Sequence, residues 1–170
     1  MKPLKVYGDT NTLRGNTSDA AEVEALEKLA GDKRLKWFTS NIVNYEIANT
    51  PNETKRNTLV ADYKAREKVP QDEKLLGFNS YGDRLTWITS PMLSDVQDEK
   101  LYAEIMKQNI KSADAKHLTQ AACNKCDVFL TCDNGIIKRC KPLEQQLSLR
   151  IMLPSELLQQ LGPETLPVQS

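Results

Sequence analysis

The sequence predicts an α/β fold of three layers, in which helices cover both faces of a central parallel sheet. Short apolar runs at 4–8, 36–39 and 127–131 alternate with amphipathic helical segments. This alternation favours right-handed crossovers and parallel strands. Acidic residues also close two of these runs, and in such sheets ligands bind beyond the carboxyl ends of the strands. We therefore expect a site at that edge.

The first half of the chain alternates strand and helix. After the strand at 4–8 and a polar turn, Ser18 is predicted to cap a helix at 19–29. A second strand at 36–39 leads to Ser40, which is placed to cap the next helix, and Pro51 breaks that helix. Residues 53–67 are predicted as a further helix.

The second half is less regular at first. Residues 68–95 are interpreted as a loop around one short apolar run at 85–88. The elements expected after it are helices at 95–110, from Ser112 onward, at 135–140 and after Pro154, with strands at 127–131 and 148–152. We expect one domain over 1–161, with a longer helical and loop insertion near 50–95 and a tail at 162–170.

The composition indicates a globular protein without a bulk electrostatic attraction for nucleic acid. Apolar residues make up 39% of the chain and charged residues 27%, and the 23 Lys and Arg balance the 23 Asp and Glu. Basic residues do gather locally, and they are interpreted as a solvated face that phosphates could also contact. They are Lys55, Arg56, Lys64, Arg66 and Lys68, then Lys138, Arg139 and Lys141.

Location is expected to be cytoplasmic, with no membrane partner. No apolar run approaches the ~20 residues of a membrane span, and the first residues lack the pattern of a secretory signal. The four cysteines, Cys123, Cys126, Cys132 and Cys140, lie close together in sequence. The one histidine, His117, is not at a zinc-finger spacing from them, so we expect core or incidental thiols.

Four acids carry the functional interpretation: Asp9, Glu46, Asp114 and Asp133. Each stands at the end of a predicted core element or on the edge of its apolar face. Two carboxylates about 4 Å apart repel by about 4 kcal/mol at an effective dielectric of about 20. A hard divalent cation such as Mg²⁺ removes that repulsion and takes oxygen ligands. A divalent metal site is therefore the leading hypothesis.

Each acid also has an ordinary structural explanation. Asp9 and Asp133 suit turns, Glu46 suits a solvated helix surface, and Asp114 suits the positive end of a helix dipole. Four polar residues lie near the acids in the sequence. They are expected either to hold a carboxylate or a water by hydrogen bonds, or simply to form hydrogen bonds within a turn. They are Thr10, Asn11, Thr131 and His117. His117 is not expected to bind metal; it could orient a carboxylate or meet a phosphate.

Taken in order, four segments resemble the motifs of the PIN domain, a nuclease family. The matching segments are Asp9-Thr10-Asn11 after a strand, Ser40 to Glu46, Asp114-Ala115-Lys116-His117 with Ala121, and Thr131-Cys132-Asp133 after a strand. The resemblance covers most of the chain outside about 50–95. Two departures stand out: Gly8 replaces an apolar residue, and Asn134 to Ile137 supply no further acid.

The resemblance implies an Mg²⁺- or Mn²⁺-dependent endoribonuclease that cleaves RNA phosphodiesters and leaves a 5′-phosphate. Asp9, Asp114 and Asp133 would hold the metal, directly or through water, and Glu46 would bind it or position the attacking water. Three alternatives stay open: a catalytically weak or inactive module that binds RNA or a partner, the toxin of a toxin–antitoxin pair resembling VapC, and a phosphoacceptor domain that uses Asp9 or Asp133. An antitoxin partner and a homodimer stay open as well.

Overall fold

The computed structural model describes residues 2–69 and 98–162. Five strands form one sheet in the order β3-β2-β1-β4-β5. The strands are β1 (Leu4–Gly8), β2 (Leu35–Thr39), β3 (Glu67–Lys68), β4 (Val128–Leu130) and β5 (Arg150–Met152). All of the pairings between neighbouring strands are parallel. The expected class, a parallel sheet between helices, is therefore confirmed.

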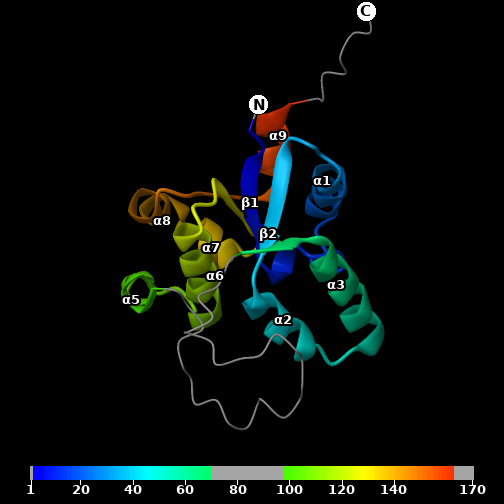
Figure 1. Ribbon diagram of the computed structural model, residues 1–170, viewed down its shortest axis with the longest axis horizontal. Helices are drawn as coiled ribbons and strands as arrows, with labels where there is room; N and C mark the ends of the chain where they lie inside the picture. Colours follow the sequence, from blue (N-terminus) through cyan, green and yellow to red (C-terminus); the bar gives the residue numbers. More distant parts are fainter. Residues whose placement is uncertain (1, 70–97, 163–170) are drawn as a thin grey trace, which may run out of the picture.

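Helices connect these strands. In chain order the described helices are the 3-10 turn η1 (Thr10–Thr12), α1 (Ala20–Ala30), α2 (Asn41–Ala48), α3 (Glu53–Ala65), α5 (Glu99–Met106), α6 (Ser112–Cys123), α7 (Asn134–Ile137), α8 (Cys140–Leu147) and α9 (Pro154–Leu161). Figure 1 shows α5, α6 and α8 on one side of the sheet and α1 and α3 on the other.

Both faces of the sheet are buried because successive strand residues point to opposite sides. Tyr7 and Phe129 face a core that includes Leu118 of α6 and Leu143 of α8. The opposite face carries Val6, Val128, Leu130 and Met152, which pack in one cluster with Leu29 of α1 and Leu157 of α9. A third cluster, with Leu13, Val43 and Leu59, joins α2 and α3 to the segment after η1.

The register brings the ends of the central strands level. Gly8 of β1 is paired with Leu130 of β4, and Tyr7 is paired with Phe38 of β2. Asp9 and Thr131 therefore follow their strands side by side, with Ser40 close behind β2. Figure 1 shows α2 beyond the carboxyl end of β2, at this same edge.

Two of the predicted helix caps were wrong by one residue, and a third stands in place but makes no cap hydrogen bond. Asp19 rather than Ser18 caps α1, since its carboxylate accepts from the amides of Ala21 and Glu22. Ser40 does stand at the start of α2, but its hydroxyl makes no cap and bonds Tyr7 instead. Ser112 is already inside α6, and its hydroxyl meets that of Tyr102. For Ser40 and Ser112, a tyrosine hydroxyl from another element competed for the serine hydroxyl.

The sequence also missed two elements. Residues 67–68, predicted as the end of a helix and the start of a loop, form the edge strand β3 against β2. The segment from Cys140 to Leu147 forms α8, where only a short helix at 135–140 was predicted. Of the predicted insertion near 50–95, residues 50–69 supply α3 and β3, whereas the run at 85–88 and most of the predicted tail lie outside the described residues.

None of the described helices combines the length and the apolar composition that crossing a membrane requires.

Candidate active site at the carboxyl edge of the sheet

Asp9 is the most deeply placed of the four acids. It follows β1 and is only 2% exposed. Its Oδ2 accepts a hydrogen bond of 2.6 Å from the Thr131 hydroxyl, whereas its Oδ1 is buried and has no hydrogen-bond partner. Burial raises the pKa of Asp9 to about 6, and the charges of Glu46 and Asp114 contribute to the rise. A buried carboxylate with one unpaired oxygen is a group that a cation would stabilise.

Thr131 connects Asp9 to the end of the neighbouring strand. Its buried hydroxyl donates to Asp9 and accepts from the amide of Asp133 at 3.0 Å. Asp133 is half-buried and caps α7, its Oδ1 accepting from the amide of Gly135 at 2.5 Å. The ends of β1 and β4 are thus joined by one threonine.

Asp114 approaches from α6. It lies in the first turn of that helix and is half-buried. Burial raises its pKa, with the negative charges of Asp133 and Glu46 acting in the same direction, while His117 and Lys111 oppose the rise. These couplings place Asp114 within electrostatic reach of both neighbouring acids.

Glu46 comes from α2 and is held by His117 of α6. The His117 Nε2 atom lies 3.1 Å from Glu46 Oε2, and the carboxylate side chain is 30% exposed. His117 itself is 2% exposed, and its Nδ1 lies 2.9 Å from the hydroxyl of Tyr7. His117 therefore lies against a carboxylate rather than in solvent.

Thr10 and Asn11 occupy η1, directly after Asp9. The Thr10 hydroxyl oxygen is buried and has no hydrogen-bond partner, and its carbonyl accepts from the Asn16 side chain at 2.8 Å. Asn11 is half-buried. Thr12, which the sequence analysis did not select, closes the turn by donating to the carbonyl of Asp9 at 2.7 Å.

The four acids are electrostatically coupled, but they do not form a closed metal cage. Within residues 2–69 and 98–162, no three His, Cys, Asp or Glu side chains lie close enough together to hold an ion. Mg²⁺ commonly keeps several waters and binds through one or two carboxylates. The unpaired Oδ1 of Asp9 and the raised pKa values of Asp9 and Asp114 fit such a partly hydrated ion.

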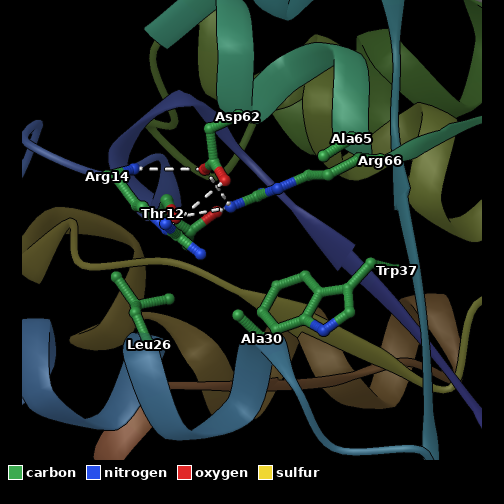
Figure 2. A pocket seen from close by; sticks show the side chains of 8 residues that line it. All are labelled: Thr12, Arg14, Leu26, Ala30, Trp37, Asp62, Ala65 and Arg66. Atoms are coloured by element: carbon green, nitrogen blue, oxygen red, sulfur yellow. Dashed lines mark hydrogen bonds and ion pairs between the residues drawn. The ribbon is translucent and has the colours of Figure 1, made fainter. Parts of the chain in front are cut away.

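Arg66 lies behind the first acid, on the side of α3. Its guanidinium donates to the Thr12 hydroxyl at 2.8 Å and to the Thr12 carbonyl at 2.6 Å, and it pairs with Asp62 at 3.2 Å. Figure 2 shows these contacts in a pocket of about 120 Å³ between α1 and α3, whose lining residues include Trp37 and Arg14 but none of the four acids. Arg66 was predicted on a solvated face, yet its side chain is 9% exposed, so that part of the prediction was wrong.

The space for Arg66 explains the unusual Gly8. A Cβ atom at that position would lie 2.3 Å from Arg66 Nη1 and 2.5 Å from the Thr12 hydroxyl. An apolar side chain before Asp9 would therefore displace the guanidinium. Glycine at this position leaves room for the Arg66 guanidinium, which pairs with Asp62.

The cysteines lie outside this site chemistry. All four are free, and Cys126 is buried. Burial raises the pKa of Cys126 and of Cys132 to about 12, so both stay thiols at neutral pH.

Sequence reasoning missed the contacts that support the acids. Tyr7 was interpreted only as a strand residue, and Ser40 as a helix cap and the first residue of a PIN-like motif. Their hydroxyls lie 2.6 Å apart in the core. A tyrosine two residues before the first acid was the only signal, and it does not reveal its partners 33 and 110 residues away.

The parallel sheet places Asp9 and Asp133 directly after the carboxyl ends of β1 and β4, the edge at which folds of this class bind their ligands. A family model for the PIN domain matches residues 6–142. The chain therefore belongs to the PIN-domain family, whose members are generally nucleases that hydrolyse RNA or DNA with divalent metal ions. Neither the curated proteins nor the solved structures compared with the chain gave a match.

Proposed function

We propose that this PIN domain is an Mg²⁺- or Mn²⁺-dependent endoribonuclease that uses Asp9, Glu46, Asp114 and Asp133. One observation carries the proposal: a buried carboxylate with an unpaired oxygen, Asp9, lies at the carboxyl edge of the sheet within electrostatic reach of Glu46 and Asp114. Asp114 is in turn coupled to Asp133. Leaving such a charge buried without a partner is costly.

The protein residues divide into holding and positioning roles. Asp9, Asp114 and Asp133 would hold the cation, directly or through water. When bound, the cation would activate water and stabilise charge on a phosphodiester oxygen. Thr131 fixes Asp9 Oδ2, which leaves Oδ1 for the ion, and His117 fixes one oxygen of Glu46. Glu46, whose side chain is 30% exposed, would orient the attacking water.

The change Asp9→Asn tests the proposal. We expect the variant to keep its fold, because Asn is isosteric and can still accept from Thr131, and to lose metal-dependent RNA cleavage by at least about 100-fold. Cleavage of a single-stranded RNA would be followed across an Mg²⁺ and Mn²⁺ series. Asp98→Asn is a matched control, because Asp98 caps α5 and Asn caps equally well. Equal activity in both variants would remove Asp9 from the mechanism.

A binding module without catalysis is the second candidate function. It is favoured by the absence of a closed group of metal ligands in the described part of the chain and by the lack of an acid from Asn134 to Ile137. RNA binding without cleavage at any metal concentration would select it.

Assembly with an antitoxin or as a homodimer is also a proposal. Growth arrest on expression, relieved by a neighbouring gene product, would support the toxin.

A further inference from the structure

A row of four polar side chains runs from the core to the edge of the site. Ser40 Oγ lies 2.6 Å from the Tyr7 hydroxyl, which lies 2.9 Å from His117 Nδ1, and His117 Nε2 lies 3.1 Å from Glu46 Oε2. The first three residues are at most 2% exposed. The row joins β1, the residue between β2 and α2, helix α6 and helix α2 itself.

The chemistry of the end group sets the direction of the hydrogen bonds. An ionised carboxylate only accepts, so His117 must carry a hydrogen on Nε2 to bond Glu46. A neutral imidazole has one N–H, and its Nδ1 is then an acceptor. The Tyr7 hydroxyl is the group placed to donate to it.

Tyr7 can serve as that donor because a phenol keeps its proton at neutral pH. Since its single hydrogen is used toward His117, the Tyr7 oxygen accepts from the Ser40 hydroxyl. Every hydrogen in the row then points toward Glu46, and every buried member has a partner.

We propose that Tyr7 and Ser40 are positioning residues that hold His117 as its Nε2–H tautomer and thereby fix the Glu46 carboxylate for the reaction. The reaction part of this inference rests on the proposed nuclease function. The tautomer itself does not, because it is a property of the metal-free chain. Outer-shell partners that orient the groups of a metal site typically change metal affinity or activity by about 10- to 100-fold when removed.

The alternative is that the row only packs the core. Tyr7 lies nearly parallel to Phe129, with ring centroids 5.6 Å apart, and is tilted by 60° against His117. The change Tyr7→Phe keeps both ring contacts and removes only the hydroxyl. A packing role would therefore survive this change, while the positioning role would not.

The single histidine makes the tautomer directly measurable. Because His117 is the one histidine in the sequence, imidazole ¹⁵N–¹H correlation spectra of the full-length, metal-free chain at pH 7.5 contain one spin system. We expect the neutral Nε2–H form in the wild type. Tyr7→Phe should give a mixture of tautomers and about a tenfold lower kcat for RNA with KM little changed. Ser40→Ala should shift the spectrum the same way by less, since Tyr7 keeps its hydrogen.

Tyr102→Phe is the matched control. It also deletes a tyrosine–serine hydroxyl contact, of 2.8 Å to Ser112, but at an exposed position, and it should leave the spectrum and the kcat unchanged. A wild-type ring that is Nδ1–H or fully protonated would overturn the inference. A Tyr7→Phe spectrum equal to that of the wild type would overturn it as well.

The two proposals fail separately. If no form of the chain cleaves RNA, the spectra still decide whether Tyr7 sets the tautomer. If the wild type cleaves RNA and Tyr7→Phe changes neither the spectrum nor kcat, the nuclease stands and the positioning role is wrong. Should Tyr7→Phe fail to fold, Ser40→Ala carries the same test with the ring stack intact.

Discussion

The burial of the Asp9 carboxylate suits the proposed metal site but lowers the stability of the metal-free fold. Its carboxylate is buried, and only one of its oxygens has a partner. In the folded chain its pKa is about 6, against an ordinary value of 3.8. The folded state therefore binds the proton more tightly than the unfolded state does, so ionising Asp9 without a counter-ion destabilises the fold.

This predicts a pH dependence with a definite sign. The contribution of Asp9 is most favourable below pH 3.8 and is lost as pH rises through about 6, by about 3 kcal/mol for a shift of about two pKa units. In metal-free buffer, the unfolding free energy of the wild type should fall between pH 4 and 7 relative to Asp9→Asn. Urea unfolding at several pH values would measure it. Parallel curves for the two proteins would show that Asp9 titrates normally.

Thr131 gives a second prediction at this scale. Thr131→Val keeps the shape of the side chain but removes the donor to Asp9 and the acceptor for the Asp133 amide. We expect a loss of about 1–3 kcal/mol in unfolding free energy and a further rise in the pKa of Asp9. Thr131→Ser, which retains the hydroxyl, is the control, and a valine variant as stable as the serine variant would contradict the account.

Among the elements, those with local signals were predicted best. Strands at 4–8 and 127–131 were apolar runs, and β1 and β4 lie there. The edge strand β3 has only two residues, Glu67 and Lys68, with no apolar pattern, so its pairing with β2 is a tertiary event that no local signal announces. α8 contains a proline and charged residues, and only its buried Leu143 and Leu147 reveal its inner face.

The contact between the end of β1 and the end of α3 also makes a prediction. Gly8→Ala should destabilise the fold by about 1–3 kcal/mol, because the added Cβ would overlap the Arg66 guanidinium. In an Arg66→Ala background the same change should cost at least about 1 kcal/mol less, as a double-mutant cycle would show. Gly31→Ala, whose Cβ meets nothing within 4 Å, is the control. Additive effects of the two changes would mean that Gly8 is required for another reason.

For the whole molecule, topology decided what the sequence could reveal. The sequence alone could predict that Asp9 and Asp133 lie at the same edge, because the ends of adjacent parallel strands share an edge of the sheet. The distance of Glu46 and Asp114 from that edge depends on how α2 and α6 pack. Residue spacing in the sequence does not determine that packing. The row from Ser40 to Glu46 depends on β1, α2 and α6 at once and could not be predicted from any one segment.

The central claim is that one divalent ion binds at Asp9, at the carboxyl edge of the sheet. A crystal structure of the full chain soaked in Mn²⁺, with anomalous difference density, tests it most directly. We predict a peak bonded to Asp9 Oδ1, with Asp114 and Asp133 reaching the same ion directly or through water. A Mn²⁺-saturated crystal with no peak at Asp9, or with the ion bound away from all four acids, would contradict the account.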